Sequence, residues 1–231
     1  MKEPALGDAA PVVLAVDIGG SHVKIMSSAG GEERKAVSGS SMNAVAMADA
    51  VDKLAEGIPY DVMSIGYPGP VVHGRVLSEP HNLAQGWVGF DFTKRFGKPT
   101  RIINDALMQA IGSYDGGRML FLGLGTGLGA AMIVDNVAQP MELAHLPYRK
   151  GRSYEDYLGE ASLEQRGRGK WKKHVLEAVT QLSSALEPDY VVVGGGNATK
   201  LGTLPPNVRL GDNANAFKGG FALWQNPQIQ V

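Results

Sequence analysis

Short apolar runs alternate with stretches of helical spacing along this chain, a pattern that predicts an α/β fold. The expected strands are the apolar runs at 12–16, 22–26, 33–37, 61–66, 101–103, 119–122, 130–134, 190–193 and 208–210. The expected helices cover 42–56, 106–114, 153–165, a long stretch ending at Leu186, and 215–224.

A turn at Asp115-Gly116-Gly117 separates two self-sufficient α/β patterns. We therefore expect an N-terminal lobe over 1–115 and a C-terminal lobe over 116–214, and the C-terminal segment 215–231 is free to pack back on the N-terminal lobe. No linker separates the two patterns, so the lobes should pack together and hinge. Residues 1–10 are expected to form a frayed tail.

The central strand pair encloses a loop with glycine at positions 123, 125, 127 and 129. Glycines this dense let backbone N–H groups point into one concavity, because no Cβ is in the way. Gly125, Thr126 and Gly127 are therefore candidates for holding phosphate oxygens. The alternative is a tight hairpin whose glycines only make the turn.

Two other phosphate-binding motifs could explain the same glycine-rich sequence. Residues 125–130 fit the G-x-G-x-x-A dinucleotide fingerprint, but that motif must open a helix, and the following residues 130–134 look like a strand. A Walker A loop needs Gly-Lys-Ser/Thr after four intervening residues, and the sequence has no such string. A strand–loop–strand phosphate hairpin remains.

A second hairpin of this kind lies near the N-terminus, where an apolar strand ends in Asp17 and continues as Ile18-Gly19-Gly20-Ser21. The acid can orient a hydrated Mg²⁺, while the amides of Gly19 and Gly20 and the Ser21 hydroxyl can hold phosphate oxygens. Two such hairpins, each opening an α/β half, indicate duplicated lobes that clamp one nucleotide or polyphosphate between them.

Three further stretches carry candidate chemistry. Asn104-Asp105 follows a strand and opens a helix, which is where a helix cap lies and also where open α/β sheets place catalytic groups. Glu142 and His145 lie in a polar segment before Pro147, although a lone His near a Glu is more often structural. Gly195, in a glycine run after the strand 190–193, suits close approach of a nucleotide's base or ribose.

Composition sets limits on the partners and the compartment. The 231 residues carry a net charge of −1, so bulk electrostatics do not favour nucleic acid or an anionic membrane, and neither is expected as a partner. The 44% apolar fraction is ordinary for a globular protein. The chain has no cysteine, so it has neither disulfides nor thiolate metal sites. It has no apolar run of signal-peptide or transmembrane character, so a cytoplasmic location is expected.

Taken together, five motifs in order resemble the ROK family of sugar kinases, over roughly residues 12–224. The first and second phosphate motifs match 17–21 and 125–129, and Asn104-Asp105 matches the segment that carries the family's catalytic base. The stretch from Asn82 to Trp87 resembles the sugar-binding loop, and 142–145 resembles the E-x-G-H sugar motif with Ala144 in the glycine's place.

The resemblance implies a two-lobed actin-like/hexokinase-like (ribonuclease H-like) ATPase fold and a glucokinase-type activity. In this family Asp105 would be the base, and Asn82, Asn104, Glu142 and His145 would bind the sugar. A further sugar-contacting acid is expected at Glu160, with Glu155 and Glu164 close enough to leave the choice open.

The same resemblance implies Mg²⁺ near Asp17, ATP or polyphosphate as donor, glucose or a related hexose as acceptor, and a homodimer. Without cysteine the chain cannot carry the zinc motif of many ROK proteins, so it is more similar to the zinc-free polyphosphate/ATP glucokinase branch. One rival is a sugar-sensing repressor, but only about eleven residues precede the first expected strand, too few for a helix-turn-helix. A catalytically dead relic is a second rival, against which the retained Asp105 argues.

Basic residues gather after the sugar motif. Eight of the 22 Lys and Arg residues lie within 149–173, opposed there by four acids. A solvated helix face is the ordinary explanation of such a run. The alternative is a site for a polyanionic donor, which we favour because glycines at 167 and 169 interrupt the segment.

Overall fold

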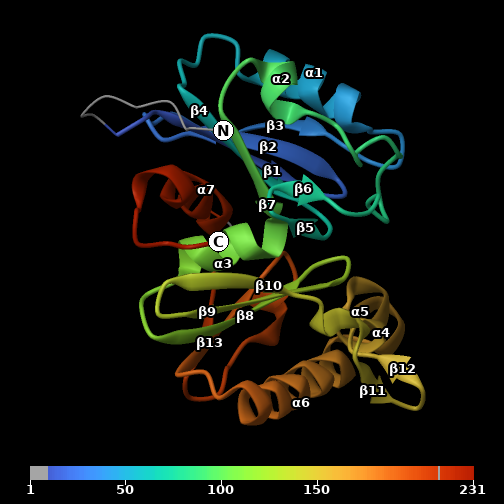
Figure 1. The fold of residues 1–231 in the computed structure, drawn as a ribbon. Helices are drawn as coiled ribbons and strands as arrows, with labels where there is room; N and C mark the ends of the chain where they lie inside the picture. Colours follow the sequence, from blue (N-terminus) through green and yellow to red (C-terminus); the bar gives the residue numbers. More distant parts are fainter. Residues whose placement is uncertain (1–9, 213) are drawn as a thin grey trace.

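The computed structural model describes residues 10–212 and 214–231, so the tail expected over residues 1–10 lies almost wholly outside the described part. Two five-stranded sheets form the framework (Figure 1). The first sheet contains, in spatial order, β3 (Arg34–Val37), β2 (His22–Ser27), β1 (Val13–Ile18), β4 (Val62–Tyr67) and β7 (Thr100–Asn104). The second contains β10 (Val137–Met141), β9 (Leu128–Val134), β8 (Arg118–Leu124), β13 (Tyr190–Gly194) and β14 (Val208–Leu210).

The two sheets repeat one topology. In each sheet, the central strand pairs antiparallel with the strand that follows it in the chain and parallel with a later strand. In the first sheet, β1 pairs antiparallel with β2 and parallel with β4. In the second sheet, β8 pairs antiparallel with β9 and parallel with β13. Both glycine motifs therefore lie at the turn of an antiparallel hairpin. The dinucleotide fingerprint is excluded, because the residues after the second motif form β9 and not a helix.

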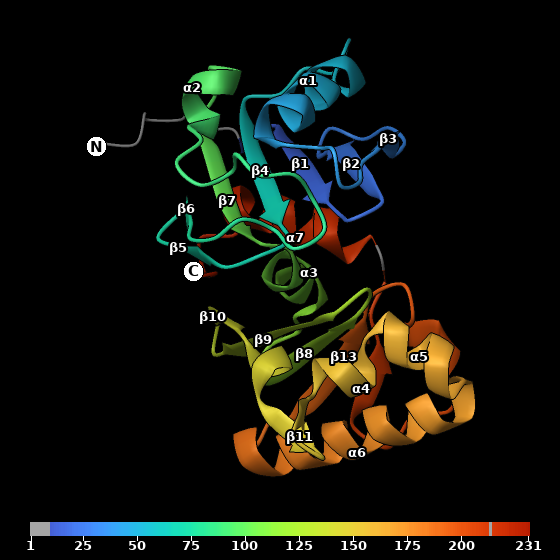
Figure 2. The same cartoon turned by 90° about the vertical axis from the view of Figure 1, so that its right-hand side faces the viewer.

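The helices cover these sheets in layers. They are α1 (Ala44–Leu54), α2 (Phe92–Phe96), α3 (Asp105–Ser113), α4 (Glu155–Leu158), α5 (Glu160–Arg166), α6 (Arg168–Leu186) and α7 (Asn215–Gln225). Figures 1 and 2 show α3 and α7 between the two sheets, α1 on the far face of the first sheet, and α6 on the far face of the second. A buried cluster joins the three middle layers, with Met108 of α3, Phe121 of β8 and Leu223 of α7 among its members.

Close packing of α3 against α7 depends on two glycines. A Cβ on Gly112 would overlap the carbonyl oxygen of Asn215, and a Cβ on Gly219 would overlap that of Met108. On its other side α7 meets the first sheet, where the buried Ser64 hydroxyl donates to the Gly220 carbonyl. Residues 215–225 thus return to the N-terminal sheet, and they support the helix that begins at Asp105.

Some elements differ from the sequence expectation. The edge strand β10, the short helix α2 and the hairpin of β5 (Val71–Val72) and β6 (Arg75–Val76) were not expected. The expected helix over 153–165 is wrong as one unit, since it breaks into α4 and α5 at Gly159.

The capping box that opens this segment is confirmed, because the Asp156 carboxylate accepts from the backbone N–H and hydroxyl of Ser153. Gly169 does not loosen its segment, because it lies inside α6. In α7, Phe217 is buried as expected, whereas Phe221 and Trp224 are half-buried.

A short hairpin and two 3-10 turns complete the described part of the chain. A hairpin of β11 (Pro147–Arg149) and β12 (Arg152–Ser153) precedes α4, and the 3-10 turns η1 (Leu143–His145) and η2 (Ala198–Leu201) lie beside the second sheet. Within the described residues, no helix is both long and apolar enough to cross a bilayer.

Candidate active site

A cleft of about 570 Å³ opens where both glycine hairpins meet the N-terminus of α3. Its lining contains most of the residues expected from sequence, namely Gly19, Gly20, Asn82, Asn104, Asp105, Gly125, Thr126, Gly127, Glu142, His145 and Gly195. The cleft lining does not include Asp17, Ser21 or Glu160. The two-sheet architecture thus brings together residues as far apart in the sequence as Gly19 and Gly195.

Asp105 is the first residue of α3 and follows the last residue of β7. The residue that caps α3 is its neighbour Asn104, whose side-chain oxygen accepts from Leu107 N at 3.0 Å. The Asn104 side-chain amide donates to the Gly69 carbonyl. The Asp105 carboxylate accepts from Ala106 N at 2.7 Å. Burial, followed by the negative charge of Asp17, raises the pKa of Asp105 to about 7. Asp105 is therefore suited to accept a proton near neutral pH.

Asp17 lies near the end of β1, behind the first glycine loop. Burial raises the pKa of Asp17 to about 6, although the nearby Lys24 ammonium acts in the opposite direction. Lys24 is itself paired with Glu33 at 3.5 Å. Two carboxylates with raised pKa values thus lie close enough to interact, which is the electrostatic signature of a functional site.

The first glycine loop is oriented by Ser38. The Ser38 hydroxyl donates to the Gly19 carbonyl at 2.7 Å, and its backbone N–H donates to the Ser21 carbonyl at 2.9 Å. In a trans peptide the N–H points opposite to the carbonyl, so the N–H of Gly20 points away from Ser38. Nothing in the sequence around Ser38 marked it as part of this loop, whereas its partner Ser21 is exposed and outside the cleft lining.

The second glycine loop is held from behind in the same way. The Gly125 carbonyl accepts from the Asn197 amide at 3.3 Å and from Glu160 N at 3.1 Å, and the Thr126 carbonyl accepts from Glu160 N at 3.2 Å. The N–H groups of Thr126 and Gly127 therefore point away from these partners. Glu160 thus contributes its backbone to the loop.

Gly195 fixes the far wall of the cleft. It has a φ of +83°, and a Cβ there would lie 2.5 Å from the Leu124 carbonyl oxygen. Only glycine accepts both the left-handed backbone and this close approach. The turn after β13 therefore packs directly against the strand that leads into the second loop.

The sugar-binding candidates line the same cleft as Asp105. Asn82 lies beside the first loop, since a Cβ on Gly20 would be 3.6 Å from the Asn82 Cβ. His145 and Glu142 are exposed at the cleft and lie 3.7 Å apart. Ala144 between them lies in the turn η1 without a positive φ, so the backbone there accepts alanine in place of glycine.

Glu79 organises the loop that carries Asn82. Its carboxylate accepts from the backbone N–H groups of Gly86 at 2.9 Å, Trp87 at 3.0 Å and Val88 at 3.2 Å. The Trp87 ring is fully buried, and its indole N–H donates to Ala84. Sequence reasoning missed Glu79, because its three partners are seven to nine residues away in a segment without regular structure.

The geometry favours Glu155 over Glu160 as the further acid of the site. Glu155 lines the cleft, and its carboxylate oxygen lies 2.5 Å from where a Cβ on Gly127 would be. Glu160 and Glu164 are exposed and outside the cleft lining. The expectation of Glu160 is therefore not supported, because the break at Gly159 turns α5 away from the cleft.

Solved structures with the same fold include ROK-family proteins. The inorganic polyphosphate/ATP-glucomannokinase from Arthrobacter sp. strain KM matches with a TM-score of 0.80 and 24% identity, over 93% of this chain and 98% of that chain. A ROK family glucokinase from Streptomyces griseus, in complex with glucose and AMPPNP, matches with a TM-score of 0.73 and 17% identity, over 92% and 99%.

A ROK family transcriptional regulator, a homologue of the E. coli MLC protein, matches with a TM-score of 0.72 and 15% identity, over 94% of this chain and 78% of that one. The sequence matches no protein-family model and no curated protein. At these identities the likeness establishes the fold. The predicted two-lobed sugar-kinase fold is thus confirmed.

Proposed function

We propose that this protein is a ROK-type sugar kinase that transfers a phosphoryl group from ATP or polyphosphate to the 6-hydroxyl of glucose or a related hexose. The observation that carries the proposal is the place of Asp105, a carboxylate with a pKa of about 7 between two glycine hairpins. Such hairpins hold phosphates, and a carboxylate beside them can accept a hydroxyl proton. The sugar-kinase neighbours support the same conclusion at the level of fold.

In the reaction, Asp105 takes the proton of the sugar hydroxyl as that oxygen bonds to the terminal phosphorus and the bond to the leaving phosphate breaks. Little covalent chemistry falls to the protein, so positioning and electrostatics supply most of the rate. The N–H groups of Gly20, Thr126 and Gly127 donate to the phosphate oxygens, where negative charge gathers. Their orientation is fixed in advance by Ser38, Asn197 and the backbone N–H of Glu160.

The residues present fit a magnesium ion. Mg²⁺ prefers oxygen ligands and is commonly bound through one or two carboxylates together with phosphates and water. Asp17, behind the first glycine loop, would hold the ion through water, and the positive charge would offset the repulsion between Asp17 and Asp105. When bound, the ion neutralises charge on the transferring phosphate.

The sugar would be held by polar side chains that line the cleft together with Asp105. These are Asn82, Asn104, Glu142, His145 and Glu155. A site built from such groups rejects analogues that lack a hydroxyl, because its own donors and acceptors would remain unpaired.

A coupled assay across hexoses, with ATP and with polyphosphate, tests the proposal. We expect the wild type to form 6-phosphorylated hexose with at least one of the two donors. Asp105→Asn should form it only at a small residual rate. If the wild type binds sugar but does not phosphorylate it, the proposed kinase activity is contradicted and a sugar-sensing function is favoured, a possibility raised by the regulator among the structural neighbours.

We also propose that the protein is a homodimer, which light scattering after size-exclusion chromatography would test.

A further inference from the structure

A second cavity, of about 600 Å³, lies on the other side of α4 from the cleft. On α4 itself Glu155 lines the cleft, whereas Tyr157 lines this cavity. The two linings share no residue. The cavity is open to solvent and is bordered by the β11–β12 hairpin and by α4, α5 and α6; its lining residues are Lys150, Arg152, Tyr157, Gln165, Arg166 and Lys170. Four of these six are cations. We call this space the basic cavity.

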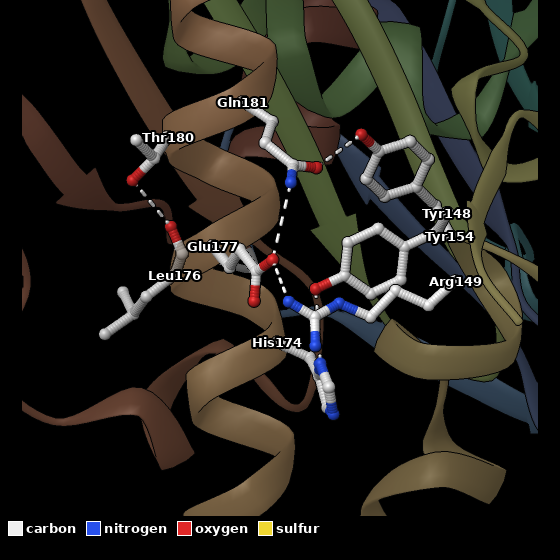
Figure 3. A network of polar contacts seen from close by, with 8 residues as sticks. All are labelled: Tyr148, Arg149, Tyr154, His174, Leu176, Glu177, Thr180 and Gln181. Carbon is white, nitrogen blue, oxygen red and sulfur yellow. Dashed lines mark hydrogen bonds and ion pairs between the residues drawn. The ribbon is translucent and has the colours of Figure 1, made fainter.

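The other basic residues of the segment serve the fold. Arg149 pairs with Glu177 of α6, next to the contact of Tyr148 with His174 (Figure 3). This network fastens the hairpin to α6. Arg168 donates to the Lys200 carbonyl at 2.6 Å, and Lys172 donates to the Thr203 carbonyl at 3.2 Å.

The four cations of the basic cavity are different. Within residues 10–212 and 214–231, none of them has an ion pair. Asp156 is an acid that interacts with two of these cations, Arg152 and Arg166, and its carboxylate accepts hydrogen bonds from Ser153. Ser153, followed by weaker contributions from Arg152 and Arg166, lowers the pKa of Asp156. Positive charge therefore exceeds negative charge around this space.

One of the cations is already fixed in position. The Arg166 side chain donates from Nε to the Ser162 hydroxyl at 3.0 Å, and its guanidinium lies 4.3 Å from the Tyr157 ring centroid. An ordered cation loses little conformational entropy on binding an anion. The remaining N–H groups of a guanidinium suit phosphate oxygens.

The aromatic wall limits what the ligand can be. The Tyr157 ring is already surrounded by Arg166, by His174 at 4.7 Å and by Tyr148 at 5.1 Å between ring centroids. It therefore offers no open face on which a nucleobase could stack, as single-stranded nucleic acids require. A polar space with several unpaired cations and no stacking surface fits an inorganic polyanion.

We propose that the basic cavity binds a chain of phosphate groups, supplied by inorganic polyphosphate, at a site separate from the cleft. This inference deepens the proposed function, because it gives the polyphosphate donor an anchor across the four-residue helix α4 from its reacting end. It also revises the set of residues expected from sequence. The site uses Lys150, Arg152, Arg166 and Lys170, while Arg168 and Lys172 support the fold.

The test measures binding of fluorescently labelled inorganic polyphosphate to the full chain without sugar or nucleotide. The double variant Arg152→Gln/Lys170→Gln should weaken binding by about tenfold or more, because two of the four charged contacts to phosphate are lost. Lys173→Gln is the matched control, since Lys173 lies on the same helix but outside the cavity lining, and it should change binding less than twofold. The wild-type affinity should fall steeply with salt, by analogy with nucleic acids.

A gain-of-affinity variant removes unfolding as an explanation. Asp156→Asn keeps an acceptor for Ser153 but removes the negative charge near Arg152 and Arg166, so it should strengthen binding. Excess ATP should leave the labelled polyphosphate bound. If ATP displaces the polyphosphate and the double variant also loses binding, the cavity instead binds the triphosphate of a nucleotide. Absence of binding, or equal weakening by Lys173→Gln, would overturn the proposal. Because the readout is binding, a failure here differs from absence of kinase activity.

Discussion

Replacing Asp105 by asparagine should reduce activity and stabilise the protein. Asparagine keeps the size of the side chain and an oxygen that can accept from Ala106 N, but it carries no charge. As a general base, Asp105 is worth about 10²–10⁴-fold in kcat. As a buried carboxylate beside Asp17, it costs the folded state free energy whenever it is ionised.

The size of the stability effect follows from the pKa of Asp105. Each pKa unit is worth about 1.4 kcal/mol, so a rise from 3.8 to about 7 costs the folded state about 4 kcal/mol once both states are ionised. The folded pKa lies above the unfolded one, so this cost is absent below pH 3.8, grows as the pH rises, and is complete above pH 7. Metal-free Asp105→Asn should therefore be more stable than the wild type at pH 8 by up to about 4 kcal/mol, with the difference vanishing in acid.

Two measurements decide the matter. One is kcat in the coupled assay, and the other is the free energy of unfolding in urea with EDTA, at pH 5 and pH 8. Asp91→Asn is the control, because Asp91 caps α2 through Lys94 N, and asparagine caps a helix equally well. If Asp105→Asn keeps more than about a tenth of wild-type kcat, Asp105 is not the general base. A variant less stable than the wild type at pH 8 refutes the electrostatic reasoning.

Three further substitutions separate positioning from packing. Glu155→Gln should raise KM for the sugar by the equivalent of about 1–3 kcal/mol and leave KM for the donor unchanged, whereas Glu160→Gln should change neither in the same kinetic assay. Glu79→Gln loosens the loop of Asn82, so KM for the sugar should rise more than KM for the donor, and Glu79→Asp should recover part of the loss; equal changes in both constants would contradict this role. Gly219→Ala forces α7 away from α3 and should lower the free energy of unfolding by about 1–3 kcal/mol in urea titrations, an expectation that an unchanged midpoint would contradict.

The parts of the fold that sequence predicted are those with a strong local pattern. Both glycine hairpins and the long helix α6 combine apolar periodicity with clear turn residues, so their neighbours along the chain specify them. The edge strand β10 has the opposite character, because it contains Pro140 and alternates exposed and buried residues without an apolar run. Its place is set by pairing with β9, a tertiary contact that no window of sequence contains.

The candidate site divides in the same way. Asp105 and the glycine loops were predicted because each motif carries its chemistry within a few consecutive residues. Ser38 and Asn197 were missed because each orients a loop that lies far away in the sequence, 19 and 72 residues from its partner. Such residues hold the peptide groups of the loops in the direction that phosphate binding requires, and sequence spacing does not reveal them.

The choice between Glu155 and Glu160 depends on one glycine. In a continuous helix, residues five apart point in different directions, so the register of the expected helix over 153–165 decides which acid faces the cleft. The structure breaks that helix at Gly159, where a Cβ would lie 2.9 Å from the Thr126 carbonyl oxygen. The absent Cβ lets the start of α5 approach the second glycine loop, so that Glu160 N donates to Gly125 and Thr126 while the Glu155 carboxylate faces the cleft. One close contact between segments about thirty residues apart therefore determines both which acid lines the site and how the phosphate loop is held.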